Sequence, residues 1–374
     1  MPANGLIPAE IVYIPTEDRA RIAVKHRPCP GGQPVILLHG LAVNADVWNL
    51  PEKWVGGVHY HSLASMLHER GCDIWLVNLR GHGAPGMHSE PGPGQSDWCV
   101  DHFILYDLPA IVNHVLEHTG HRPIVVSASM GSMTLAGFLQ GARLVGTGSE
   151  VHIEADSQVA KSRHDQLAGA VFTAFPAALR WPESLYDEKG RLRWRNLLRD
   201  WWGGDDVVNY PFQMLSRLGW LQTILEAAGE FPSSWTRGSL QIAGVFAGLS
   251  ESHADVLLRA RSQVMDHMKA GVLRQLAKSV RAGGFLSDLG SPDHVYSDHY
   301  ERIELPVLVV HGARDRLAHI DVTRSVFYDR IRSTDKQFLL DPDIAHGDIH
   351  DAPIASQRLY PRILDWILAH TQNG

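Results

Sequence analysis

A serine at a predicted sharp turn is the first residue in this chain that could do chemistry. The run from Pro123 to Leu135 reads PIVVSASMGSMTL, so an apolar stretch leads into a cluster of small residues. This pattern predicts a buried strand that breaks at Ser129 into a helix starting near Gly131, which lifts the hydroxyl clear of the backbone. At a helix N-terminus the dipole and the free N–H groups favour the negative charge of acyl transfer. A serine- and glycine-rich turn without chemistry is the alternative.

A serine hydroxyl is a weak nucleophile near neutral pH, and it needs a base that is itself held by a partner. Two later predicted strands are followed by suitable residues: Asp315 comes after the strand 306–312, and His346 lies in the loop after the strand 336–340. We expect His346 to accept the Ser129 proton through one ring nitrogen while Asp315 binds the other. The chain order Ser, Asp, His fits a sheet whose strand ends meet at one edge.

Neighbouring residues compete for both of these roles. The chain holds 22 histidines, and a single histidine is usually a surface or structural residue. His350 is assigned to the start of the next helix, while Asp341 and Asp343 are assigned to turn formation. These assignments leave His346 as the candidate base and Asp315 as its partner.

Two backbone N–H groups are candidates for holding a developing oxyanion. One belongs to Met130, directly after the serine. The other belongs to Leu41, because the apolar strand 35–38 runs into His39-Gly40-Leu41 and the glycine lets the loop turn its N–H groups inward. An ordinary strand-ending turn is the alternative interpretation of this tripeptide.

The elements that must position these residues alternate between strands and helices. This alternation predicts an α/β fold with a mostly parallel central sheet and helices on both faces. A first hairpin is expected at 11–14 and 21–25, and a glycine- and proline-rich exposed loop at 84–96. Further strands are expected at 35–38, 73–78, 123–128, 167–173, 306–312 and 336–340, and helices at 62–71 and 102–118.

The alternation stops near residue 176, and the stretch 176–298 is predicted as an inserted helical cap. The core would then be formed by 1–175 and 299–374. Six of the 11 tryptophans lie in the cap, and a cap rich in aromatic residues would suit an apolar acyl chain. The alternative is that they fill the cap's own core. These tryptophans are Trp181, Trp194, Trp201, Trp202, Trp220 and Trp235.

Composition narrows the classes of partner. The formal net charge of −7 over 374 residues gives no basic surface for nucleic acid. No apolar stretch approaches the roughly 20 residues of a membrane span, and no secretory signal precedes residue 18, so we expect a cytoplasmic protein. Three widely spaced cysteines without a C-x-x-C pair are expected as reduced thiols. The expected partner is a small-molecule ester or lipid, and a homo-oligomer stays open.

No metal or organic cofactor is expected. The chain has no phosphate-binding loop and no dinucleotide-binding fingerprint. His59 and His61 could form a zinc pair, but no cysteine or carboxylate ligand lies near them in the sequence, so this evidence is weak.

These motifs together resemble the α/β-hydrolase superfamily, and more narrowly the acid lipase group that includes gastric and lysosomal acid lipases. The resemblance runs over most of the chain and implies a serine esterase or lipase with Ser129, Asp315 and His346 as its triad. It also implies a helical cap that shapes the acyl pocket. The matching segments are Thr16–Asp18, Leu38–Leu41, Ser62–Ala64, Asp73–Asn78, Arg80–Gly81, Tyr106–Ala110, Asp315–Ala318, Asp321–Val322 and His346–Ile349.

One motif departs from the family pattern. The elbow of that group usually reads Gly-His-Ser-Gln-Gly, whereas here Ser127 begins the motif and Met130 follows the serine.

The leading hypothesis is a carboxylic ester hydrolase acting on apolar acyl esters. An acyltransferase, thioesterase or polyester-processing enzyme with the same acyl-serine is the alternative, and a non-catalytic binding protein is a third.

Overall fold

The computed structural model describes residues 10–55, 58–84, 86–180, 230–231, 264, 266–315 and 317–371. Its centre is an eight-stranded sheet with the strand order β1-β2-β6-β3-β7-β10-β13-β14. The first two strands pair antiparallel with their neighbours, and all pairs from β6 to β14 are parallel. The strands are β1 (Glu10–Pro15), β2 (Arg21–Arg27), β3 (Pro34–Leu38), β6 (Asp73–Val77), β7 (Ile124–Ala128), β10 (Gly169–Thr173), β13 (Val307–Gly312) and β14 (Lys336–Asp341).

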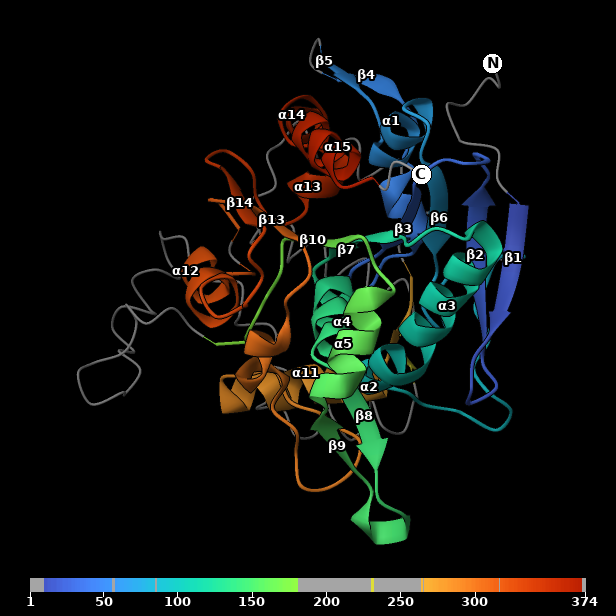
Figure 1. Ribbon diagram of the computed structural model, residues 1–374, viewed down its shortest axis with the longest axis vertical. Helices are drawn as coiled ribbons and strands as arrows, with labels where there is room; N and C mark the ends of the chain where they lie inside the picture. The colour runs from blue at the N-terminus through green and yellow to red at the C-terminus, as the bar shows by residue number, and fades with distance from the viewer. Residues whose placement is uncertain are drawn as a thin grey trace, which may run out of the picture.

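Helices cover both faces of this sheet (Figure 1). One layer contains α1 (Leu63–Glu69), α13 (Asp348–Asp351), α14 (Pro353–Arg358) and α15 (Tyr360–Ala369). The other contains α2 (Val100–His102), α3 (Leu108–Thr119), α4 (Met130–Leu139), α5 (Ser157–Asp165) and α11 (Ala270–Ala282), while α12 (Ile320–Val322) lies near the β14 edge (Figure 1). The predicted α/β fold is confirmed.

The alternating side chains of the central strands explain why two layers form. Ile36 and Leu38 of β3 pack into one apolar cluster, whereas Val35 and Leu37 pack into a second cluster on the opposite face. Every residue of β3 is buried. A strand buried on both faces reads as a continuous apolar run, which is the pattern that made these strands predictable.

Several predicted boundaries agree with the structure. The hairpin at 11–14 and 21–25 is β1 and β2, and the helix expected at 102–118 extends over residues 100–119, with a π-helical turn from Phe103 to Asp107 between α2 and α3. Gly120 ends α3 in the left-handed conformation at φ 70°. A left-handed C-terminal residue is the usual stop of a helix, so this glycine terminates α3.

The described residues also form three two-stranded ribbons outside the central sheet. Two-stranded ribbons are formed by β4 (Lys53–Val55) with β5 (Val58–Tyr60), by β8 (Ala142–Val145) with β9 (His152–Ala155), and by β11 (Glu230–Phe231) with β12 (Met268–Lys269). Most of the predicted cap, including its tryptophans, lies outside the described residues, so the boundaries 176 and 298 stay predictions. Within the stretch predicted as the cap, Val264, Val272 and Leu276 are buried.

A buried ion-pair network unites three of the quoted motif segments. The Arg80 side chain is fully enclosed, and its guanidinium binds Asp107 at 2.6 Å and Asp18 at 2.9 Å. Burial lowers the pKa of Arg80, but the two carboxylates more than offset this and raise it above its ordinary value. These motif residues therefore hold the loop after β6 to α3 and to the first hairpin.

In the described part of the chain, none of the helices combines the length and the apolar character that crossing a membrane would require.

Candidate active site

Ser129 occupies a strained turn between β7 and α4. Its φ of 50° and ψ of −115° are unusual for a residue with a side chain. The turn is held because the Ser129 N–H donates to the Thr173 carbonyl at 3.0 Å, while its own carbonyl accepts from the N–H groups of Ser132 and Met133. A Cβ at Gly131 would lie 2.5 Å from the His39 carbonyl oxygen, so only glycine fits there. The predicted strand–turn–helix at this serine is confirmed.

The structure brings the three predicted side chains together. The Nε2 atom of His346 lies 2.9 Å from the Ser129 hydroxyl oxygen, and its Nδ1 atom lies 2.8 Å and 3.0 Å from the two carboxylate oxygens of Asp315. Asp315 follows β13 and His346 follows β14, so neighbouring parallel strands deliver them to one edge of the sheet. This is the hydrogen-bonded order that activates a serine nucleophile.

Two backbone N–H groups also hold the Asp315 carboxylate in place. Its Oδ1 atom accepts the backbone N–H groups of Leu317 at 2.9 Å and Ala318 at 2.8 Å. Burial raises the pKa of the Asp315 carboxyl, but the adjacent His346 and these hydrogen bonds outweigh it and hold that pKa below its ordinary value. The carboxylate is therefore charged near neutral pH, and it can stabilise the imidazolium that forms when His346 takes a proton.

The two predicted oxyanion donors flank the serine. A Cβ built on Gly40 would lie 3.2 Å from the Ser129 Cβ and 3.8 Å from its hydroxyl oxygen, which places the loop before Leu41 directly against the nucleophile. Met130 is the first residue of α4, where backbone N–H groups lack helical acceptors. Within the described residues, no hydrogen bond occupies the N–H of Leu41 or of Met130.

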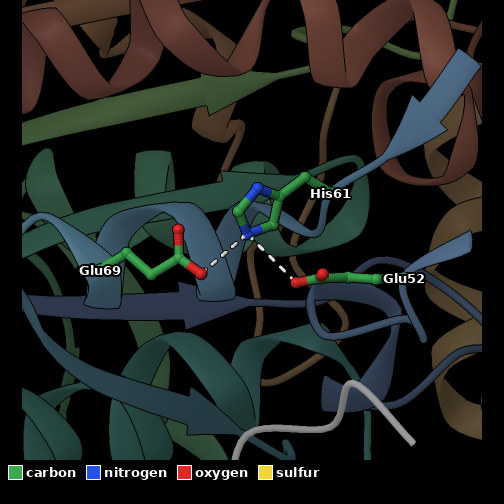
Figure 2. A group of neighbouring side chains, drawn as sticks. All are labelled: Glu52, His61 and Glu69. Carbon is green, nitrogen blue, oxygen red and sulfur yellow. Dashed lines mark ion pairs between the residues drawn. The ribbon is translucent and has the colours of Figure 1, made fainter. Parts of the chain in front are cut away.

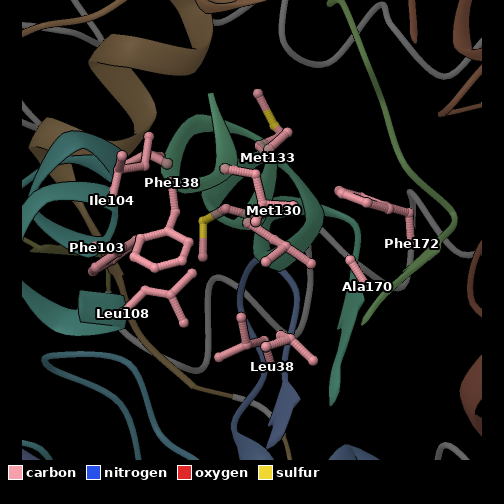
Figure 3. Packing of buried hydrophobic residues seen from close by; sticks show 14 of the residues in the cluster. Leu38, Phe103, Ile104, Leu108, Met130, Met133, Phe138, Ala170 and Phe172 are labelled. Carbon is pink, nitrogen blue, oxygen red and sulfur yellow. The ribbon is translucent and has the colours of Figure 1, made fainter. Parts of the chain in front are cut away.

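The Met130 side chain itself points into the core. Met130 is 2 % exposed and belongs to a cluster with Leu38, Phe172 and Phe138 (Figure 3). All residues of α4 are buried, so the helix is fixed from every side. Met130 thus places its backbone N–H beside Ser129 and its apolar side chain in the core.

The buried His39 ring fixes the loop that contains Gly40 and the candidate donor Leu41. Its Nε2 atom accepts the Leu79 backbone N–H at 3.1 Å, which leaves the ring proton on Nδ1, and Nδ1 donates to the Gly40 carbonyl at 2.8 Å. Burial, assisted by His82, lowers the pKa of His39 well below its ordinary value, so the ring is neutral. The Gly40 carbonyl and the Leu41 N–H belong to the same planar peptide, and His39 therefore sets the direction of that donor.

Two residues of the stretch predicted as a cap contact the same loop. The Asp266 N–H donates to the Ala42 carbonyl, and the Asn44 N–H donates to the Val264 carbonyl, both at 2.9 Å. The Asp266 carboxylate also accepts the Gly83 N–H at 2.6 Å. Sequence reasoning missed these contacts, because a lone aspartate far along the chain carries no recognisable signal.

Ser127 explains the departure at the start of the elbow motif. Its hydroxyl donates to the Val171 carbonyl at 3.0 Å and lies 2.9 Å from the Ser132 hydroxyl, while the Thr173 hydroxyl donates to the Ser127 carbonyl at 2.9 Å. All these groups are buried. A serine is accommodated in place of the usual glycine because each of its polar atoms finds a partner.

The rival residues lie elsewhere. His350 is in α13, and burial, with a contribution from His346, lowers its pKa to about 3. The Asp341 carboxylate accepts the Asp343 N–H at 2.9 Å, and both carboxylates bind Arg358. Their assignment to the helix start and to the turn is confirmed.

No carboxylate is close to His59 and His61 in the sequence, but the fold brings two carboxylates to His61. Two glutamates approach the His61 ring in space, namely Glu52 and Glu69 (Figure 2). They were missed because one lies before β4 and the other at the end of α1, so no short sequence spacing links them to the histidine.

Comparison with known proteins identifies the family and several relatives of this chain. A family model described as alpha/beta hydrolase fold matches residues 33–353. The lipase lipl-5 of Caenorhabditis elegans is 34% identical over 112 residues, which are 28% of this chain and 26% of that protein. Human lipase member M is 28% identical over 182 residues, which are 45% of this chain and 41% of that protein. The matches thus span less than half of each relative's length.

A solved structure is similar along nearly its whole length. The crystal structure of Paleococcus ferrophilus monoacylglycerol lipase has a TM-score of 0.53 at 16% identity, covering 94% of this chain and 99% of that one. At this identity the likeness concerns the fold alone. Because the family model covers most of the sequence, and the sheet order and elbow agree with it, this chain belongs to the alpha/beta hydrolase fold family.

Proposed function

We propose that this protein is a serine-dependent carboxylic ester hydrolase that acts on apolar acyl esters through an acyl-enzyme on Ser129. The observation that carries the proposal is the continuous hydrogen-bonded path from the Ser129 hydroxyl through His346 to Asp315. The two free N–H groups beside the serine support it. The similarity to proteins named lipases adds independent support for an ester substrate.

In this mechanism the Ser129 oxygen attacks the ester carbonyl carbon while His346 Nε2 takes the hydroxyl proton. The carbonyl oxygen becomes an oxyanion, and the N–H groups of Leu41 and Met130 hold it. His346 then gives the proton to the leaving alkoxide, which departs as the alcohol and leaves an acyl-serine. A water molecule then loses a proton to His346 and attacks the acyl carbon. The bond from that carbon to the Ser129 oxygen breaks, His346 returns the proton to this oxygen, and the carboxylic acid is released.

The preference for apolar acyl groups has its own support. It is supported by the names of the relatives and by the tryptophan-rich composition of the stretch 176–298. The chain-length optimum is therefore part of the proposal that an experiment must determine.

The test is hydrolysis of p-nitrophenyl esters from acetate to palmitate by the wild type, Ser129→Ala and Ser132→Ala. We expect Ser129→Ala to lower kcat by about 10⁴ or more, and Ser132→Ala, whose hydroxyl does not contact His346, to lose less than about tenfold. An acetate optimum would argue against apolar acyl groups. A wild type inactive on every ester but active on acyl thioesters would overturn the ester assignment.

A further inference from the structure

A second cluster of chemically competent side chains lies outside the triad, on the connection between β3 and β6. The His61 ring follows β5, Glu52 precedes β4, and Glu69 is the last residue of α1 (Figure 2). The Nε2 atom of His61 lies 3.1 Å from a Glu52 carboxylate oxygen and 3.4 Å from a Glu69 carboxylate oxygen. The three candidate ligand atoms lie within 4.8 Å of one another.

We propose that Glu52, His61 and Glu69 form a binding site for a divalent first-row transition-metal ion of the Zn²⁺ class. An imidazole nitrogen with two carboxylate oxygens suits such ions, whereas Mg²⁺ and Ca²⁺ prefer oxygen ligands only. Tetrahedral bonds of about 2.0–2.2 Å place neighbouring ligand atoms about 3.4 Å apart, close to the two measured separations.

The orientation of the His61 ring distinguishes this arrangement from a simple ion pair. In an ion pair, the Nε2–H bond would be directed at one carboxylate oxygen. Here Nε2 is enclosed but makes no hydrogen bond with either glutamate, nor with any other described residue, although both oxygens are within ion-pair distance. Figure 2 shows the two carboxylates on either side of this nitrogen. A cation on the axis of the nitrogen lone pair would contact all three side chains.

The surroundings fit a site that has three protein ligands and one solvent ligand. The Glu69 side chain is 62% exposed, whereas those of His61 and Glu52 are 22% and 27% exposed. One side of the cluster is therefore open, so water can take the fourth position. Two exposed or half-exposed carboxylates also supply the negative charge that attracts a dication before it loses its hydration shell.

The connection that carries the three ligands is itself hydrogen-bonded to the helices that follow the candidate base. The His61 backbone N–H donates to the Ser356 hydroxyl of α14 at 3.0 Å, and the Tyr60 hydroxyl donates to the His350 carbonyl of α13 at 2.8 Å. The ligands belong to three separate segments of the chain. We therefore expect the bound ion to stabilise the folded protein, since metal binding to the native state alone raises its stability.

The first experiment is a titration of the full-length, EDTA-treated and dialysed protein with Co²⁺, followed by visible absorption. We expect one equivalent of Co²⁺ to produce ligand-field bands of a four-coordinate site, and Zn²⁺ to abolish them by displacement. His61→Ala should weaken binding by more than about 100-fold. His59→Ala is the matched control, since that histidine is exposed and lies outside the cluster, and it should bind Co²⁺ like the wild type.

The second experiment is thermal unfolding with and without Zn²⁺. At a free concentration about 100 times the dissociation constant, we expect the Tm to rise by about 3 °C in the wild type and in His59→Ala. The rise should be absent in Glu69→Gln, whose exposed side chain is not needed for folding. Absence of Co²⁺ bands in the wild type, or equal binding by wild type and His61→Ala, would overturn the proposal.

Discussion

The backbone N–H of Asp266 donates a hydrogen bond to the carbonyl oxygen of Ala42, and the nitrogen and the oxygen are 2.9 Å apart. Ala42 follows Leu41 directly and has a φ of 62°, so it occupies a conformation that a side chain rarely adopts. The segment around Asp266 therefore supports a strained loop that also carries a candidate oxyanion donor. A substitution in this segment should therefore change the rate of ester hydrolysis by moving the Leu41 N–H.

The Asp266 carboxylate provides a way to test this support. Asp266→Ala leaves the Gly83 N–H without its acceptor, and a lost buried partner costs about 1–3 kcal/mol. We expect kcat for ester hydrolysis to fall about tenfold with a smaller change in KM. Asp266→Asn keeps an oxygen acceptor and should retain most of the activity. Equal kcat in the alanine variant and the wild type would show that the contact is only structural.

His39 should also determine the position of the Leu41 N–H, because its ring binds the carbonyl of the same peptide. His39→Leu removes both the hydrogen bond to the Gly40 carbonyl and the acceptor for the Leu79 N–H. Loss of one oxyanion donor costs about 10²–10³ in kcat, and a misaligned donor should cost somewhat less. We expect a fall of about 10–100-fold, measured at saturating substrate.

Two conservative variants separate the contributions of the His39 ring nitrogens. His39→Asn can retain a donor near the Nδ1 position, and His39→Gln can retain an acceptor near Nε2. If the Gly40 contact is the important one, His39→Asn should keep more kcat than His39→Gln. Identical activity of all three variants would contradict a positioning role.

Ser127→Gly restores the usual first residue of the elbow motif and should affect stability more than catalysis. The variant loses the hydrogen bonds of the Ser127 hydroxyl and adds backbone freedom in β7. We expect the free energy of unfolding to drop by about 1–3 kcal/mol in urea denaturation. The kcat should stay within about threefold, because no atom of Ser127 contacts His346. A large loss of kcat without loss of stability would contradict this reading.

The parts of the site that depend on local patterns were predictable from the sequence. Ser129 and Asp315 each follow an apolar strand that is buried on both faces, and His346 follows the partly exposed edge strand β14, so the strand pattern placed all three at strand ends. The sharp turn was visible because Gly131 permits a backbone approach that no side chain allows. These signals are local, so they can be recognised from short stretches of the sequence.

The parts that depend on distant contacts were not predictable. Asp266 and Glu52 become informative only once the fold places them beside Gly83 and His61. The polar stretch after α4 also hid the β8–β9 ribbon and α5, because their few buried residues give little periodic signal. A cue was present for α5, since the Asp156 side chain caps it by accepting the Gln158 N–H at 2.7 Å.

The dependence of the free energy of unfolding on acidic pH should test whether folding lowers the pKa of Asp315. The pKa of this carboxyl is held below its ordinary value of 3.8 in the folded protein. A depressed pKa contributes stability that is fully present above the unfolded value and is lost as pH falls through the folded value. We therefore expect the free energy of unfolding to decline as pH is lowered from about 5 to 3, measured by urea denaturation.

Asp315→Asn is the matched control, because it keeps the size of the side chain and an oxygen that can accept the N–H groups of Leu317 and Ala318. It cannot lose a charge on acidification, so its stability should decline less steeply between pH 5 and 3. Its kcat should fall by about 10⁴, since a neutral amide no longer fixes the His346 tautomer. Equal acid slopes in the two proteins would mean that folding does not lower the pKa of the Asp315 carboxyl, and the proposed pairing with His346 would fail.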